Sequence, residues 1–421
     1  MSAPDQNKFL QNKSPIASDF PESLYAGKCI CLIGGKLQGV EAAYLAKKAG
    51  LIVVLIDRNP SALAQSLCDE FHCFDITKDK SRFISISESS DFMIPVNENE
   101  ETIAFLKSVS NEIKCPLLFD FDAYEISCDK TKSKNYFKTV GVPTPADKPD
   151  EPPYFVKPPS ESGSVGARII HSNDELKSVP PNYLIEEYLT GPVISLEVVG
   201  DGKDYTVVKE TLIHIDDVWD CCMVTPLPSN EIYRKITFDL AKGLRLKGIM
   251  DVEAISSQKG WKVLEIDARF PSQTPTCVYF SSGVNLLLLL IEAFSNPEFK
   301  EKGLPNSTNK KYENAYCIFE HFRKEDGKLI SGGEHLISAG SNFHPFAADI
   351  NENGIEIFES TLNGAGGSTG ENSYSAYTVI TYAKTEAETK EKRKRAMSFI
   401  LETSFQVRPA ASRRPDLENK N

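Results

Sequence analysis

The order strand, glycine turn, helix, strand at residues 29–57 constrains the fold of this chain more than any other feature of its sequence. The two strand segments, residues 29–33 and 51–56, are apolar throughout, and the residues between them have a helical pattern. A unit of this kind joins two parallel strands, so we expect a parallel sheet near the start of the chain. Similar apolar segments at residues 91–95 and 115–119 predict further strands of that sheet.

Length and charge limit the class of protein. The 421 residues are too many for one ordinary core, so two or three packed domains are expected. A hydrophobic content of 41% is typical of a globular enzyme. The formal net charge of −12 argues against a nucleic-acid partner, which would require clustered Lys and Arg. The basic run at residues 390–395 lies in a helical pattern behind Glu386 and Glu388, which favours a solvated helix face.

Cysteine usage and hydropathy predict a cytoplasmic protein without a membrane partner. The ten cysteines are irregularly spaced and include no C-x-x-C pair, so we expect reduced thiols rather than disulfides or a zinc site. The longest apolar run, residues 286–291, is too short to cross a bilayer. The polar start of the chain lacks the apolar core of an export signal.

Shifts in pattern along the chain predict its domain organisation. A Lys-rich helix and a Pro-punctuated linker separate the first sheet from longer β-patterned segments, and the chain closes on a helix near residues 385–403. We expect a flexible N-terminal arm (1–27), a Rossmann-like domain (28–120), a lid (121–192), a catalytic domain with a C-terminal extension (193–408) and a flexible tail (409–421).

The glycine turn at residues 34–39 departs from a dinucleotide-binding fingerprint. That fingerprint needs a glycine where this chain has Lys36, because the backbone must approach a pyrophosphate. Lys36 suits a small anion or a carboxylate instead, although a purely structural turn explains the pattern equally well. Asp57 ends the next strand and could hold a hydroxyl or an amine. Glu98 follows the strand at 91–95, where ligands of open α/β sheets gather, but a polar loop is nearly as good an interpretation.

Two lysines and a small-residue loop have the properties of a phosphate site. Lys130 follows Asp129, and Lys157 ends an apolar strand before two prolines that fix its position. Lysine is a common phosphate ligand. The loop at residues 160–166 is rich in Ser and Gly, and its backbone N–H groups could close over phosphates. Each feature is weak evidence when taken alone.

Two acidic segments complete the pattern. Asp251 and Glu253 alternate with apolar residues, as do Glu265 and Asp267, so each pair faces one side of its strand. Arg269 continues the second pair. Hard oxygen ligands at this density suit magnesium, and we favour a metal site over a solvated strand face, which does not explain why one sign of charge dominates.

Two loops beside these segments are candidate ligand contacts. Residues 186–188, Glu-Glu-Tyr, follow an apolar strand and could offer backbone groups to an adenine and a carboxylate to a ribose or amino group. On this tripeptide alone, an exposed acidic turn is the better interpretation. Residues 270–276 form a polar loop directly after the acidic strand and could bind an amino-acid substrate through hydroxyl and amide groups.

Four motifs resemble those of the ATP-grasp superfamily in their order and spacing, and the resemblance covers the chain from Lys28 onward. They are Asp129-Lys130 with Gly-Val-Pro-Thr-Pro at 141–145, Val-Lys-Pro at 156–158, Glu-Glu-Tyr at 186–188 and Glu-x-Asp-x-Arg at 265–269. Longer runs are similar to the ligase family of pyrrolysine biosynthesis, which joins 3-methyl-D-ornithine to L-lysine; they lie at residues 31–39, 95–99, 247–255 and 265–276. The resemblance implies an α/β (α+β) ATP-grasp fold with a Rossmann-like parallel-sheet domain, a lid and a catalytic domain. It also implies ATP and two Mg²⁺ ions as cofactors, and an acyl phosphate that an amine converts to an amide.

The resemblance also implies roles for individual residues. Arg269 and Lys157 would be catalytic. ATP would contact Lys130, Lys157, Ser164, Glu186, Glu187, Tyr188 and Glu197. Magnesium would be held by Asp251, Glu265 and Asp267, the last standing where asparagine is common in the superfamily. The amino-acid substrates would contact Lys36, Leu37, Asp57, Glu98, Glu253, Arg269, Ser272, Gln273 and Thr274.

Three alternatives remain open on the sequence. Another ATP-grasp ligase would share the ATP and metal residues but not the loop at 270–276. A nicotinamide-dependent dehydrogenase would use the first domain, and Lys36 argues against it. A nucleotide-sensing module without chemistry would not need the complete carboxylate set with its arginine.

Overall fold

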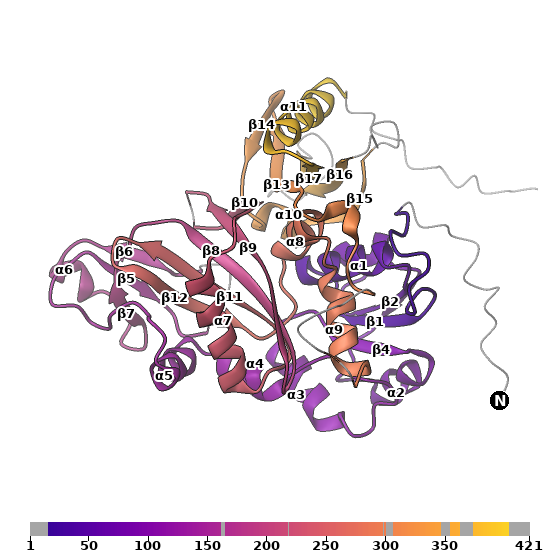
Figure 1. Cartoon of the computed structure of the whole chain (residues 1–421), viewed down its shortest axis with the longest axis horizontal. Coiled ribbons are helices and arrows are strands. Elements are labelled where there is room, and N and C mark those ends of the chain that lie inside the picture. Colours follow the sequence, from indigo (N-terminus) through magenta and orange to yellow (C-terminus); the bar gives the residue numbers. More distant parts are fainter. Residues whose placement is uncertain are drawn as a thin grey trace, which may run out of the picture.

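The computed structural model describes residues 16–160, 165–217, 219–297, 299, 306–346, 354–362 and 374–403 (Figure 1). Strands of the described residues form a four-stranded parallel sheet, a three-stranded antiparallel sheet and a ten-stranded antiparallel sheet. The mixed α/β class expected from the sequence is therefore confirmed. No described helix has both the length and the apolar character needed to span a membrane.

The parallel sheet has the strand order β3-β2-β1-β4. Its strands are β1 (Cys29–Ile33), β2 (Ile52–Asp57), β3 (Glu70–Cys73) and β4 (Phe92–Pro95), and helix α1 (Leu37–Lys48) connects β1 to β2. The strand predicted at residues 115–119 was wrong: only Leu117 forms a single bridge, to Met93. One physical reason is Pro116, which has no N–H to extend the ladder. Strand β3, short, only partly buried and at the sheet edge, was missed.

Short helices surround this sheet and lead out of it. They are a 3₁₀ turn (Leu63–Leu67), α2 (Lys80–Ser89), α3 (Glu100–Val109), α4 (Phe121–Ser127) and α5 (Lys130–Val140). Each α-helix from α2 to α5 starts with an Asp or Asn whose side chain accepts hydrogen bonds from backbone N–H groups of the first turn. The cap of α5 is Asp129, so the cap fixes Lys130 at the first helical position.

The small antiparallel sheet has the order β6-β5-β7 and lies at the left of Figure 1, beside α5 and α6. Its elements are β5 (Tyr154–Lys157), β6 (Arg168–Ile170), α6 (Asn173–Leu176) and β7 (Leu184–Glu187). Buried Tyr154, Val156 and Ile170 form its core. Because alternate residues of β5 face opposite sides, the strand directs Val156 into this core and Lys157 away from it.

The large sheet runs in the order β12-β11-β8-β9-β10-β13-β17-β16-β15, with β14 paired to β13. Its first half consists of β8 (Val193–Asp201), β9 (Tyr205–Ile215), β10 (Cys221–Pro226), β11 (Lys247–Ser257) and β12 (Gly260–Asp267). Helix α7 (Glu231–Leu244) packs on β8 and β9, and helices α8 (Thr274–Ser282) and α9 (Leu286–Ser295) also contact the sheet.

The second half of the large sheet carries the C-terminal elements, at the top of Figure 1. They are a 3₁₀ turn (Lys310–Tyr312), β13 (Tyr316–Glu325), β14 (Lys328–Ser331), α10 (His335–Ser338), β15 (Gly340–Pro345), β16 (Ile355–Leu362), β17 (Tyr374–Ala383) and α11 (Glu386–Glu402). Helix α11 is the predicted closing helix. Its Arg393 binds Glu320 of β13 through two hydrogen bonds of 2.6 and 2.7 Å, so one of its basic residues fastens the helix to the sheet.

Residues 16–27, which the sequence assigned to an arm, lie against the core. Ile16 and Phe20 are buried in the cluster that contains α1, α8 and α9. The carboxylate of Asp19 accepts hydrogen bonds from the hydroxyls of Tyr279 (2.9 Å) and Tyr312 (3.1 Å). This segment therefore binds elements that lie about 260 to 290 residues later in the chain.

Candidate active site

A cleft of about 1540 Å³, its open mouth included, is lined by the small sheet, by residues 186–188, which we call the hinge, and by the β11–β12 end of the large sheet. We call it the central cleft. Thirteen of the residues predicted to bind ATP, metal or substrate line it: Lys130, Lys157, Glu186, Glu187, Tyr188, Asp251, Glu253, Glu265, Asp267, Arg269, Ser272, Gln273 and Thr274.

The carboxylates of β11 and β12 face one another across the two strands. Asp251 is opposite Asp267 and Glu253 is opposite Glu265, while the intervening apolar residues are buried in the core. Burial, with the charges of Glu265 and Asp267, raises the pKa of Glu253 to about 8. Burial also raises the pKa of Asp267 to about 6, although Arg269 opposes that shift. The strand pair thus concentrates more negative charge than the protein alone compensates.

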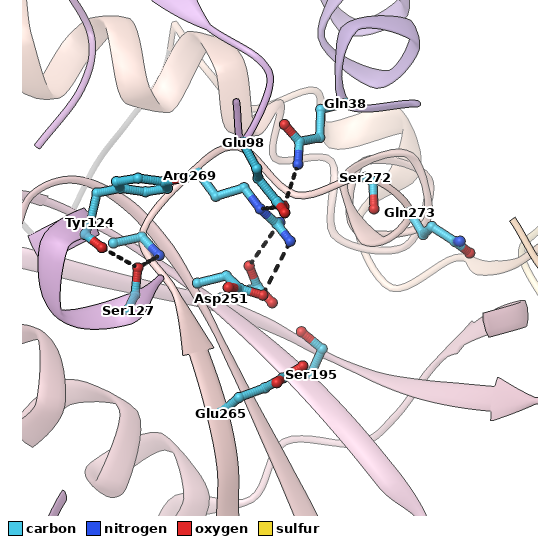
Figure 2. A network of polar contacts seen from close by, with 12 residues as sticks. Gln38, Glu98, Tyr124, Ser127, Ser195, Asp251, Glu265, Arg269, Ser272 and Gln273 are labelled. Atoms are coloured by element: carbon cyan, nitrogen blue, oxygen red, sulfur yellow. Dashed lines mark hydrogen bonds and ion pairs between the residues drawn. The ribbon is translucent and has the colours of Figure 1, made fainter. Parts of the chain in front are cut away.

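Three cations partly neutralise this group. Lys130 Nζ lies 3.1 Å from Glu265 Oε2, and the pKa of Glu265 is lowered because Lys130 and Lys157 outweigh the effect of burial. Arg269 forms ion pairs with Asp267 (3.1 Å) and Glu98, and its Nη1 lies 3.8 Å from Asp251 Oδ1. Figure 2 shows the Arg269 guanidinium between Glu98 on one side and Asp251 on the other.

The carboxylate set fits a magnesium ion that arrives with a phosphate ligand. Among the described residues, no three His, Cys, Asp or Glu side chains converge as a metal site made of protein alone would require. However, Asp251 Oδ1 is a buried oxygen without a hydrogen-bond partner. Magnesium in phosphate-transfer sites takes only one or two carboxylates and fills its other positions with water and phosphate oxygens. The chemistry of the residues therefore suits that ion.

A second pocket lies at the carboxyl ends of the parallel strands, and we call it the N-terminal pocket. Lys36, Leu37, Asp57 and Glu98, four of the predicted substrate residues, line it. The Asp57 carboxylate already accepts hydrogen bonds from Gly35 N (2.6 Å) and Asn59 N (2.7 Å), so it shapes the glycine turn.

The two pockets share a boundary. Arg269, Ser272 and Glu334 line both the central cleft and the N-terminal pocket. At this boundary, Gln38 Nε2 donates a 2.8 Å hydrogen bond to the same oxygen of Glu98 that binds Arg269 (Figure 2). The same three side chains therefore contribute to the walls of both pockets.

The hinge carboxylates are engaged by lysines. Glu186 is buried, 3% exposed, and forms ion pairs with Lys157 (3.2 Å) and with Lys134 of α5. Glu187 is paired with Lys259 and accepts a hydrogen bond of 3.0 Å from Ala146 N. The side chain of Glu186 thus holds two cations, whereas the sequence suggested a ligand contact. Nothing in the sequence pattern marked Lys134.

The two remaining predicted ATP contacts are Ser164 and Glu197. Ser164 lies outside the described residues. Glu197 is opposite Asp251 on β8, is fully buried and does not line the central cleft. Burial raises the pKa of Glu197 to about 7, with the Thr274 hydroxyl opposing the shift. It lies on the strand next to β11 in the same sheet.

The loop at residues 270–276 is held from two sides. The Glu334 carboxylate accepts hydrogen bonds from Gln273 Nε2 (2.6 Å) and Ser272 Oγ (3.0 Å). The buried Glu41 carboxylate of α1 accepts hydrogen bonds from Thr276 N (2.9 Å) and Thr276 Oγ1 (2.7 Å). Sequence reasoning missed Glu334; the only signal was its position directly after the glycine pair at residues 332–333.

Comparisons with known proteins show which family this chain resembles. Residues 127–273 match the ATP-grasp domain. The chain is 52% identical over 376 residues to the 3-methyl-D-ornithine–L-lysine ligase of Methanosarcina barkeri, and the match covers 89% of this chain and 98% of that relative. It is 58% identical over 332 residues to the enzyme of the same name from Methanosarcina acetivorans, with 79% of this chain and 89% of that relative covered.

A solved structure shows the same fold at low sequence identity. It is the biotin carboxylase domain dimer of Hydrogenobacter thermophilus 2-oxoglutarate carboxylase, in complex with MgADP, ADP and bicarbonate. The TM-score is 0.66 at 17% identity, and the match covers 88% of this chain and 89% of that one.

Proposed function

Because the chain belongs to the family of 3-methyl-D-ornithine–L-lysine ligases and contains an ATP-grasp domain, we propose that it joins these two amino acids at the expense of ATP. The product would be an amide between the 3-methyl-D-ornithine carboxyl group and the side-chain amine of L-lysine. This places the reaction in pyrrolysine biosynthesis.

The reaction has two steps. A carboxylate oxygen of 3-methyl-D-ornithine attacks the terminal phosphorus of ATP, and ADP leaves, which gives an acyl phosphate. The neutral amine of lysine then attacks the acyl carbon, inorganic phosphate leaves, and the amine loses a proton. In both steps negative charge develops on phosphate oxygens, so fixed cations at the reacting centre lower the barriers.

The observation that carries the proposal is the boundary of the two pockets. A condensation of two amino acids needs one binding site for the activated acyl group and an adjacent one for the amine. The central cleft has the lysines that suit phosphates, the N-terminal pocket has Glu98 and Asp57, and Arg269 belongs to both. The excess of carboxylates suits substrates that carry additional ammonium groups.

Within the proposed reaction, individual residues have the following roles. Lys130 and Lys157 would bind phosphates, and the backbone of the hinge at residues 186–188 would bind the adenine. Asp251, Glu265 and Asp267 are the residues that would hold magnesium, which when bound offsets phosphate charge. Arg269, Ser272, Gln273, Thr274 and Glu253 would contact methylornithine, and Lys36, Leu37, Asp57 and Glu98 would contact lysine.

The decisive experiment is mass spectrometry of the reaction mixture with ADP release measured in parallel. The purified protein receives ATP, Mg²⁺, L-lysine and 3-methyl-D-ornithine, and each amino acid is omitted in turn. We expect a condensed product that requires both amino acids and ATP. ADP release with a product from another amino acid would leave an ATP-grasp ligase but overturn the substrates, and no ADP under any condition would overturn the reaction.

A further inference from the structure

The hinge carboxylate Glu186 lies between two lysines that have different surroundings. Lys157, on β5, lines the central cleft and also donates a 3.1 Å hydrogen bond to Leu264 O. Lys134, on α5, does not line the cleft, and it forms a second ion pair of 2.7 Å with Asp147. All three members of the Lys134–Glu186–Lys157 group are at most 7% exposed. The group is therefore a buried cation–anion–cation chain.

The arrangement of these three buried charges has a consequence for phosphate binding. Lys157 can form a strong ion pair with a phosphate only if its ion pair with Glu186 weakens. Glu186 is only 3% exposed, and a buried carboxylate without a cation beside it raises the free energy of the protein. Lys134 removes that cost, since its ammonium group remains bound to Glu186 when Lys157 turns to the cleft.

We propose that Lys134 is a positioning residue for ATP: it holds Glu186 compensated and so frees Lys157 for the phosphates. The inference rests on the proposed ATP site but not on the identity of the amino acids. Lys134 acts through Glu186 and Lys157 and does not itself touch the nucleotide.

The chain offers a matched control one helical turn away. Lys138 is also on α5 and also binds Asp147, at 2.5 Å, but it is half-exposed and has no contact with Glu186. Lys138→Met removes the same charge from the same helix and the same carboxylate. Any difference between Lys134→Met and Lys138→Met therefore reports on the contact with Glu186.

The test is a binding titration of the Mg²⁺ complex of AMP-PNP, a non-hydrolysable ATP analogue, by calorimetry on the full chain without amino acids. We expect Lys134→Met to weaken binding by about tenfold or more, because one buried charge is left without its partner. Lys138→Met should bind within about twofold of the unchanged protein, as expected for an exposed ion pair.

A double variant separates positioning from direct contact. If Lys134 acts only through Glu186, then Lys134→Met combined with Glu186→Gln should bind AMP-PNP as tightly as Glu186→Gln alone. This comparison does not require Lys134→Met to fold by itself, because the double variant removes both charges of the buried pair. A tenfold weaker double variant would mean that Lys134 contacts the phosphates directly, and it would overturn the proposal.

Two further outcomes would also overturn it. Equal affinity of Lys134→Met and Lys138→Met would show that the contact with Glu186 is unimportant for nucleotide binding. Absence of AMP-PNP binding in the unchanged protein would remove both this inference and the proposed function. If AMP-PNP binds with the expected pattern and ADP is released but no condensed product of the two amino acids forms, only the substrate assignment fails.

Discussion

Glu334 is an acidic residue at the boundary of the two pockets, and it shows how one side chain can set the shape of a loop. Its carboxylate holds both Ser272 and Gln273 by hydrogen bonds. We expect Glu334→Gln to raise the KM for methylornithine by about tenfold, because a charged acceptor contributes roughly 1.5–3 kcal/mol to each such bond. Initial rates at varied methylornithine concentration measure this effect.

The affinity for AMP-PNP is the control for Glu334→Gln, because the hydrogen bonds lost orient the substrate loop and not the lysines. It should stay within about twofold of the unchanged protein. A KM for methylornithine that does not change would show that the loop keeps its shape without the charge of Glu334.

His321 gives a prediction on the pH dependence of stability. It is buried on β13, its Nδ1 lies 3.1 Å from Thr378 Oγ1, and burial lowers its pKa to about 3. In the unfolded chain a histidine has a pKa of about 6.5, so below that pH the unfolded state takes up a proton that the folded state refuses. The stability that neutral His321 contributes is therefore complete above about pH 6.5 and is lost as the pH falls towards 3.

We expect His321→Asn, which can keep the contact with Thr378, to flatten the acid side of the stability curve. Between pH 6 and 4 the free energy of unfolding should fall less steeply than in the unchanged protein, by up to about 1.4 kcal/mol per pH unit. Urea unfolding at several pH values measures the slope. Identical slopes for the two proteins would mean that His321 is protonated in the folded state.

At the scale of elements, the carboxylates of strands β11 and β12 determine the affinity of the site for Mg²⁺. Asp267→Asn removes one charge from the four carboxylates that these strands bring together. We expect the Mg²⁺ concentration for half-maximal ADP release to rise by about tenfold, because a charged oxygen ligand becomes neutral. The melting temperature without Mg²⁺ should not fall, since repulsion among the remaining acids decreases.

Asp239→Asn, an acidic residue on the exposed face of α7, is the matched control for this change. It should leave the Mg²⁺ titration unchanged. An unchanged titration in Asp267→Asn as well would remove Asp267 from the metal site.

The elements that could be predicted from the sequence are those with a strong local pattern. The alternation around Asp251 and Asp267 was enough to place the carboxylates on one strand face, and the first parallel strands were found from their apolar runs. Strand β3 has no such pattern, because none of its four residues is fully buried, so an apolar run is not required there. The partners Lys134 and Glu334 could not be predicted, because each meets the site across more than 50 residues of chain.

At the scale of the whole molecule, the segment before β1 holds distant parts together. We expect Asp19→Ala to lower the free energy of unfolding by about 2–4 kcal/mol, since it leaves the hydroxyls of Tyr279 and Tyr312 without their acceptor. Thermal melting checks this. Glu22→Ala, an exposed residue three positions later, should change the melting temperature little. A melting temperature of Asp19→Ala as high as that of the unchanged protein would mean that the contacts of Asp19 add nothing to stability.

The ion pair between Glu98 and Arg269 limits how far this protein is modular. The parallel sheet and the acidic strands look exchangeable, as separate parts of one chain. Yet a buried arginine that met a foreign first domain without Glu98 would lose one of its counter-charges beside the reacting groups. A chimera that seeks a new amine substrate by exchanging the first domain must therefore carry Glu98 and Gln38 with it, so the smallest transferable unit crosses the domain boundary.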